Sequence, residues 1–169
     1  MADYTCSCCG EVHAAWPDWH FAAPAAVGAV PPDEREARVD LTSDGCTIDG
    51  REFYAKGPLS LPVQGGGQRL TFGVWVSLAG PDFDAYAKLF GREDRAAGAA
   101  FLGWLGNDVP GFEAEAPLAV RLHVREYPLR PWVEPAPDDH PLAAAYRTGV
   151  PRAEAVARVE RLLHPPAGA

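Results

Sequence analysis

Two segments alternate apolar and polar residues strictly enough to predict β-strands, and they constrain the fold more than any other feature. Residues 70–78 place four apolar side chains on one face: Phe72, Val74, Val76 and Leu78. Residues 118–127 do the same with Leu118, Val120, Leu122 and Val124. Because successive side chains of a strand point to opposite faces, each segment buries one face of a sheet. We therefore expect both strands in one sheet, with Val74, Val76, Val120 and Leu122 buried.

The second half of the chain carries the helical patterns. Residues 81–90 place apolar side chains at helical spacing and precede Gly91, which suits a helix C-cap. Residues 151–164 form the strongest pattern, supported by Glu154 and Arg158 one turn apart. Strands come first and helices close the chain, which predicts an α+β fold with a mainly antiparallel sheet and helices packed on one side. We expect one domain over residues 1–165 and a frayed tail over residues 166–169.

Charge and hydropathy exclude several classes of partner. The 169 residues include 23 acidic and 15 basic side chains, which gives a formal net charge of −8. This balance argues against a general nucleic-acid binder, which needs a basic surface for phosphate. No apolar run approaches the ~20 residues of a membrane span. The first four residues, MADY, show no basic or apolar region of a signal peptide. We therefore expect a cytoplasmic protein without nucleic-acid or membrane partners.

Residues 4–13 are predicted to form a cysteine-rich turn, and this turn is a candidate zinc site. Cys6 and Cys9 form a C-x-x-C pair followed by Gly10, a spacing that lets two thiolates bind one metal ion. Tetrahedral zinc needs two further ligands, and the chain has no second C-x-x-C pair. The candidates for these two ligands are Cys46, His13, His20 and Cys8, and we expect Cys46 and His13 to be the ligands. Alternatively, these small thiols pack the protein interior without a metal.

The polar faces of the two predicted strands suggest a binding surface. One face carries Trp75, and the other carries Arg121, His123 and Arg125. If the strands are neighbours, an indole ring lies beside two guanidinium groups, which suits an anionic or aromatic ligand or a protein partner. Alternatively, Trp75 is covered by Trp132 or by a helix, and His123 lies on a solvated sheet face.

A predicted helix start, DDHP at residues 138–141, adds His140 to the candidate site residues. Asp138 and Asp139 suit a helix N-terminus, where a carboxylate caps free backbone N–H groups and complements the helix dipole. A cap does not require the histidine. His140 is therefore also a candidate metal ligand or acid–base group.

Six sequence segments occur in an order that resembles one bacterial family. They are residues 6–10 (CSCCG), 41–50 (LTSDGCTIDG), 72–78 (FGVWVSL), 101–105 (FLGWL), 109–112 (VPGF) and 139–143 (DHPLA). Together they resemble the family catalogued as domain of unknown function 2199, from Cys6 to about Pro165. The resemblance implies a small, single-domain bacterial protein located in the cytoplasm. It implies no activity, substrate or catalytic residue.

Two classes of function fit these residues. The first is a non-enzymatic binding domain with a zinc site and a Trp/Arg/His surface for a protein or a small anionic ligand; an acidic inhibitor of a basic toxin belongs to this class. The alternative is a metal-dependent hydrolase or other small-molecule enzyme that uses His140, His123 and an aspartate. The glycines at residues 65–67 predict a hairpin loop because they lack the phosphate-loop pattern, and no serine lies in a G-x-S-x-G sequence. These absences favour the binding domain.

Overall fold

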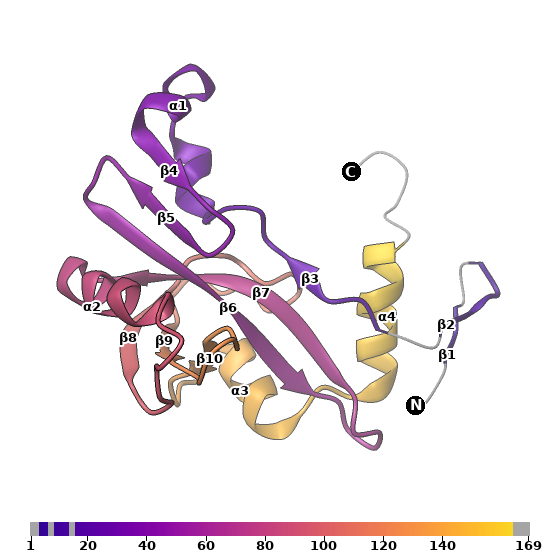
Figure 1. Ribbon diagram of the computed structural model, residues 1–169. Coiled ribbons are helices and arrows are strands. Elements are labelled where there is room, and N and C mark those ends of the chain that lie inside the picture. Colours follow the sequence, from indigo (N-terminus) through magenta and orange to yellow (C-terminus); the bar gives the residue numbers. More distant parts are fainter. Residues whose placement is uncertain (1–3, 7–8, 14–15, 164–169) are drawn as a thin grey trace.

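The computed structural model describes residues 4–6, 9–13 and 16–163, and its main feature is a curled, mainly antiparallel sheet (Figure 1). Seven strands follow one another in the order β10-β9-β8-β7-β6-β5-β4, and β3 pairs in parallel with β7. The strands are β3 (Trp19–His20), β4 (Val39–Leu41), β5 (Gly45–Ile48), β6 (Glu52–Pro62), β7 (Arg69–Leu78), β8 (Ala100–Leu105), β9 (Ala119–His123) and β10 (Trp132–Pro135). The predicted α+β fold with a mainly antiparallel sheet is confirmed.

Four α-helices accompany the sheet in the described part of the chain: α1 (Arg35–Arg38), α2 (Gly80–Phe90), α3 (Pro141–Thr148) and α4 (Arg152–Leu163). The three predicted helices correspond to α2, α3 and α4. Two short 3-10 turns, η1 (Ala25–Ala29) and η2 (Pro32–Glu34), precede α1. None of the described helices has the length and apolar character needed to cross a membrane. The predicted tail, residues 166–169, lies outside the described residues.

The long β6–β7 hairpin is the centre of the sheet. Ten residue pairs join its strands, from Phe53↔Leu78 to Pro62↔Arg69. The predicted hairpin loop at residues 65–67 connects the strands, and Gly65 and Gly67 have positive φ angles of 78° and 64° there. Glycine suits these positions because a side chain disfavours positive φ. The two strands of the hairpin are longer than the other described strands of the sheet, which pair on either side of them.

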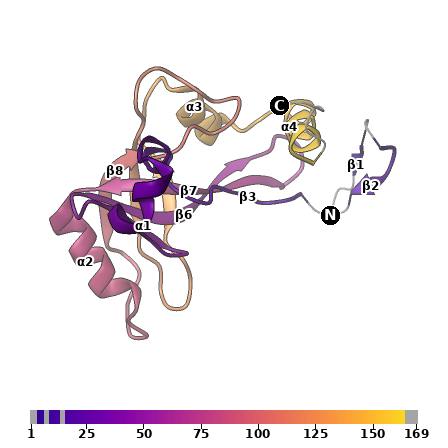
Figure 2. The same ribbon diagram turned by 90° about the horizontal axis from the view of Figure 1, so that it is seen from above.

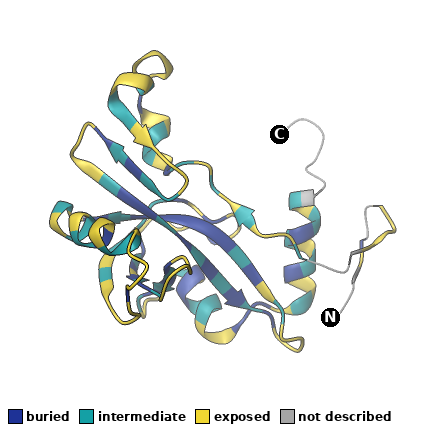
Figure 3. Ribbon diagram, viewed as in Figure 1, coloured by how far each residue is buried: buried dark blue, intermediate teal, exposed yellow. Residues whose placement is uncertain are grey.

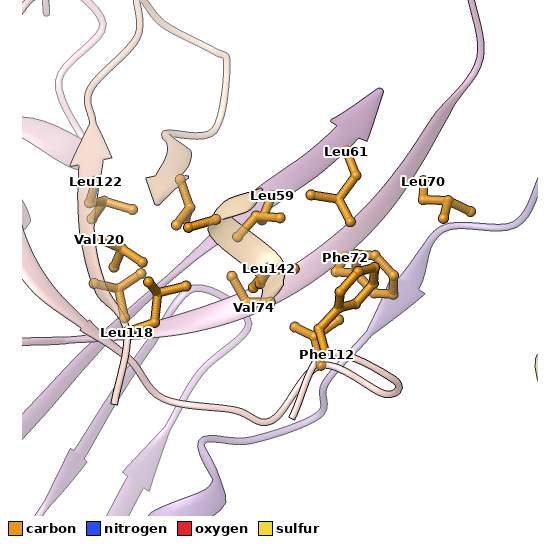
Figure 4. Close-up of a cluster of buried hydrophobic side chains, with 14 of the residues drawn as sticks. Leu59, Leu61, Leu70, Phe72, Val74, Phe112, Leu118, Val120, Leu122 and Leu142 are labelled. Atoms are coloured by element: carbon orange, nitrogen blue, oxygen red, sulfur yellow. The ribbon is translucent and has the colours of Figure 1, made fainter. Parts of the chain in front are cut away.

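The inner face of the curled sheet encloses the main hydrophobic core (Figures 3 and 4). The four residues predicted to be buried, Val74, Val76, Val120 and Leu122, are completely inaccessible to solvent. Strands β7 and β9 share the sheet as predicted, although β8 lies between them. Leu59 and Leu61 of β6 and Leu142 of α3 fill the remaining space. Burying side chains of this size contributes roughly 1.5–3 kcal/mol each before the entropy cost of folding.

The sheet curls until β10 approaches the second half of β6, and Gly57 permits this approach. A Cβ atom at Gly57 would lie 2.9 Å from the carbonyl oxygen of Pro131 and 3.2 Å from Cγ2 of Val133. Backbone oxygen cannot move away as a flexible side chain can. Gly57 therefore lets the edge strand β10 pack closely against β6 over the core.

Replacing Gly57 with alanine is expected to lower the free energy of unfolding by about 1–3 kcal/mol, because the added methyl group overpacks a closed contact. Gly91→Ala is the matched control: its φ is −82° and its Cβ would have no heavy atom within 4 Å. The control should change stability by less than about 0.5 kcal/mol. Urea denaturation measures both variants. Equal stability of the two would show that β10 does not lie against β6.

Candidate functional site

The N-terminal cysteines lie in a short hairpin of β1 (Tyr4–Thr5) and β2 (Val12–His13). Cys6 is buried and Cys9 is exposed. The turn is closed by the backbone N–H of Gly10, which donates to the carbonyl of Cys6 at 2.9 Å, and Gly10 has a φ of 73°. A backbone hydrogen bond from Glu11 lowers the pKa of Cys9, but desolvation and the adjacent Cys6 thiol leave that pKa above its ordinary value. The Cys6 thiol is therefore near enough to Cys9 to affect its pKa.

Cys46 does not join this pair, which corrects the predicted ligand set. It is buried on β5 in a second apolar cluster, with Val30, Ile48, Tyr54 and Trp75, whereas Cys6 belongs to the main core. Figure 1 shows β4 and β5 next to α1. In Figures 1 and 2 the β1–β2 hairpin lies at the opposite end of the molecule from α1. Burial, with smaller effects of Asp40 and Glu52, raises the pKa of Cys46 to about 11. Cys46 is thus a neutral core thiol near pH 7.

The other predicted ligands give no further convergence. Among the described residues, no three His, Cys, Asp or Glu side chains are grouped so as to hold a metal ion. Cys8 and the side chain of His13 lie outside the described part of the structure. His20 lies on β3, where a Cβ at Gly73 would be 2.2 Å from its Nδ1. His20 therefore packs over β7, and the zinc site stays a prediction about Cys6, Cys9 and His13.

Trp75 is not part of an exposed surface, contrary to the first interpretation of the strand pattern. The side chain is completely buried, and its indole N–H donates to the carbonyl of Phe21 at 3.1 Å. The Lys56 ammonium lies 5.2 Å from the centre of the ring. Trp132 does not provide the cover. The segment that follows β3 packs on the indole instead, through Phe21, Val27 of the 3-10 helix η1, and Val30. Trp75 anchors this segment to the sheet.

His123 lies on the outer face of β9 in contact with two residues of β10. Its Nε2 is 2.7 Å from a carboxylate oxygen of Glu134, and its ring stacks on Trp132 with centroids 4.1 Å apart and planes within 9°. The strand register places these residues side by side, because Trp132 pairs with His123 and Glu134 pairs with Arg121. The arrangement fixes the imidazole in one orientation and leaves Trp132 partly exposed.

Four arginines surround two small hollows beside this stack. Arg69 and Arg125 line one hollow, of about 200 Å³; Arg121 and Arg147 line the other, of about 210 Å³. Tyr146 of α3 lines both. Within the described chain, none of these arginines pairs with a carboxylate, although Arg69, Arg125 and Arg147 each donate to a backbone carbonyl. The predicted pair Arg121 and Arg125 thus belongs to a larger cationic cluster.

Sequence reasoning missed Arg69, Arg147 and Tyr146 because they come from distant parts of the chain. Arg69 begins β7, whereas Tyr146 and Arg147 lie near the end of α3. Burial and the charge of Glu134 raise the pKa of Tyr146, and Arg69 opposes this. The phenol therefore stays protonated at neutral pH, and its O–H can donate to an anion together with the guanidinium groups.

An exposed apolar strip adjoins the cationic cluster. Leu102 and Trp104 of β8 are 65% and 52% exposed, and they border a hollow of about 480 Å³ with Ser77 and Ala119. Leu102 pairs with Arg121, and Trp104 pairs with Ala119. The sequence did not identify Leu102 or Trp104 as site residues. No pattern identified which face would remain uncovered.

His140 caps α3, so the histidine itself performs the role predicted for its acidic neighbours. Its Nδ1 accepts a hydrogen bond from the backbone N–H of Leu142 at 3.1 Å. A carboxylate oxygen of Asp138 accepts from the backbone N–H of His140 at 2.9 Å. These bonds satisfy donors that the first helical turn leaves free. They account for His140 without a catalytic role.

His140→Ala is expected to lower the free energy of unfolding by about 1 kcal/mol, the usual cost of losing a helix N-cap. His140→Asn should retain most of the wild-type free energy of unfolding because an asparagine oxygen can accept the same hydrogen bond. Thermal and urea denaturation of both variants measure the difference. A fully stable His140→Ala variant would contradict the capping role.

These features define a class: an α+β protein whose curled sheet has an arginine- and tryptophan-rich outer face that no other described element covers. Residues 5–150 match the family described as an uncharacterized protein conserved in bacteria, DUF2199, and the chain belongs to this family. The predicted resemblance is thus confirmed, although the match ends before α4. Neither the curated proteins nor the solved structures searched include a match to this chain.

Proposed function

We propose that this protein is a non-enzymatic binding domain whose outer face over β8, β9 and β10 binds an acidic protein segment. The observation that carries the proposal is that Leu102 and Arg121 are paired across β8 and β9. Leu102 is an exposed apolar side chain. Arg121 has no carboxylate partner within the described part of the chain. A small anion would use the arginines alone. The apolar strip favours a protein.

The composition of this face supports the proposal. Tryptophan, tyrosine and arginine are the side chains that most often dominate the energy of protein interfaces. Here Trp104, Trp132, Tyr146 and Arg121 occur on neighbouring elements, and they adjoin an exposed leucine. An apolar centre with a polar rim is the usual anatomy of a specific interface. A partner residue of aliphatic or aromatic character fits the hollow between Ser77 and Trp104.

The charge of this face indicates that the partner also carries acidic residues. The chain carries a net charge of −8, yet the two hollows between Arg69, Arg121, Arg125 and Arg147 contain, among the described residues, the carboxylate of Glu134 alone, which His123 already binds. Asp138 and Asp139 lie beside Arg147 in a separate hollow. Guanidinium groups bind carboxylates through paired hydrogen bonds. An acidic segment would therefore complement this face while the rest of the surface repels it.

Selection of a random peptide library on the immobilised protein tests this proposal. We expect enriched peptides that combine an aromatic or aliphatic residue with Asp or Glu. Affinity of a synthetic winning peptide should fall about tenfold or more in Trp104→Ala, and likewise in Arg121→Glu, because the loss of a hot-spot Trp or Arg costs about 2 kcal/mol or more and tenfold corresponds to about 1.4 kcal/mol. Binding should also weaken with added salt, which screens exposed charges.

The matched controls are Leu41→Ala and Arg51→Glu, since both residues are exposed and lie on or beside β4–β6, away from the proposed face. Neither should change peptide affinity. Enrichment of basic peptides, or equal losses in controls and test variants, would overturn the proposal. A change of mass in light scattering on Trp104→Ala would instead identify a second copy of this chain as the occupant, which also contradicts an acidic partner.

The proposal also includes a structural zinc ion at Cys6 and Cys9, with His13 as a further ligand. The hydrogen bond from Gly10 to Cys6 supports it, because it closes the backbone between the two cysteines, and the Cys6 thiol is near enough to Cys9 to affect its pKa. Zinc–thiolate bonds of about 2.3 Å require this convergence. Such an ion would stabilise the hairpin without taking part in chemistry.

Metal analysis of the purified protein, reconstituted with zinc, tests this site. We expect about one zinc ion per chain, as for a closed structural site. Cys9→Ser should lose the zinc, and Cys46→Ser should retain it because Cys46 belongs to the other apolar cluster. Cobalt substitution should show thiolate-to-metal absorption in the wild type and in Cys46→Ser. Retention of metal by Cys9→Ser, or its loss from Cys46→Ser, would contradict the proposed ligands.

A further inference from the structure

A second site lies at the other end of β7, between that strand and α4. It is a cavity of about 480 Å³, within the range usual for small-molecule sites. We infer that it binds a small molecule with an apolar body and a carboxylate. This inference is independent of the proposed protein interface, because no residue lining the cavity belongs to the outer face of β8–β10.

The cavity walls are mainly apolar and come from four parts of the chain, one of which is the loop at residues 110–113. Trp19 of β3, Leu70 and Phe72 of β7, and Val159 and Leu162 of α4 face it. Trp19 also has a buried indole N–H without a hydrogen-bond partner among the described residues. Apolar lining with few polar groups is characteristic of sites that enclose the hydrocarbon part of a ligand.

Arg158 holds the cavity open by joining α4 to the loop at residues 110–113. Its guanidinium lies 4.0 Å from the Phe112 ring centre and donates to the carbonyls of Pro110 at 2.9 Å and Gly111 at 3.1 Å. Gly111 has a φ of 79°, and a Cβ there would collide with Arg158. The site is therefore formed before a ligand arrives, which lowers the entropy cost of binding.

The charges at the cavity favour an anion. Three charged residues line it: Arg158, Arg161 and Glu113. Glu113 accepts from the backbone N–H of Gly111 at 2.8 Å, and Arg158 pairs with Glu154. Arg161 is exposed, and among the described residues its one hydrogen bond runs from Nε to the carbonyl of Ala157. Its two terminal amino groups remain available to a carboxylate, the group that a guanidinium binds best.

Titration with three straight-chain amphiphiles, each below its micelle concentration, tests the inference. The probes are dodecanoate, dodecanol and dodecylammonium, and the readout is the indole N–H signal of Trp19 in NMR spectra, assigned with Trp19→Phe. We expect dodecanoate to shift this signal at the lowest concentration and dodecylammonium at the highest. Arg161→Glu should weaken dodecanoate binding about tenfold, the effect of losing one charge-assisted contact, and should favour dodecylammonium.

Arg51→Glu is the control, because it changes the net charge equally at an exposed site remote from the cavity. It should leave all three affinities unchanged. If dodecanoate leaves the Trp19 signal unmoved, the cavity does not bind such a ligand. Equal binding of the three probes, or equal effects of the two charge reversals, would show adsorption without a carboxylate site and would overturn the inference. Peptide binding at the outer face should persist in Arg161→Glu, which separates the two proposals.

Discussion

The pairing of β6 with β7 is the interaction on which the rest of the structure depends. Ten residue pairs hold the two strands together, and β7 is covered on both faces. Val74 and Val76 contribute to the main core on one side, and Trp75 contributes to the second cluster on the other. Because both clusters include side chains of one strand, β7 fixes the chain around β3 and η1 relative to the curled sheet and to β8.

Arginines divide into those that build the fold and those that remain available for binding. Arg95 is 6% exposed and donates to three backbone carbonyls, those of Phe90, Arg125 and Leu129. The rings of Phe90 and Tyr127 lie 5.2 and 5.7 Å from its guanidinium carbon. A buried cation is tolerated when its donors are satisfied in this way. Arg95 thereby ties the end of α2 to the loop after β9, whereas Arg121 makes no such hydrogen bond within the described part of the chain.

The alternation of side chains determined what the sequence could predict. It correctly placed Val74, Val76, Val120 and Leu122 on the buried face, since a shift of one residue would have exposed all of them. It could not predict the fate of Trp75, because a two-residue parallel strand such as β3 leaves no periodic signal. Cys46 was misassigned because zinc coordination was inferred by counting thiols, while its position was set by β5 and a separate apolar cluster. His140 was missed as a cap because aspartate is the commoner choice.

The outer face of the sheet is covered unevenly, and this asymmetry carries the functional argument. The chain around β3 and η1 seals the half that contains Trp75, where the backbone N–H of Trp75 and the carbonyl of Ala23 are joined through the buried Asn107 amide. The other half leaves Leu102 and Trp104 in water. Exposed apolar area of this kind costs about 25 cal/mol per Å² relative to burial, so a fold that could have covered it gains stability by doing so. The proposed partner would bury this strip and pair with Arg121, which has no carboxylate partner among the described residues, and it would recover that free energy on binding.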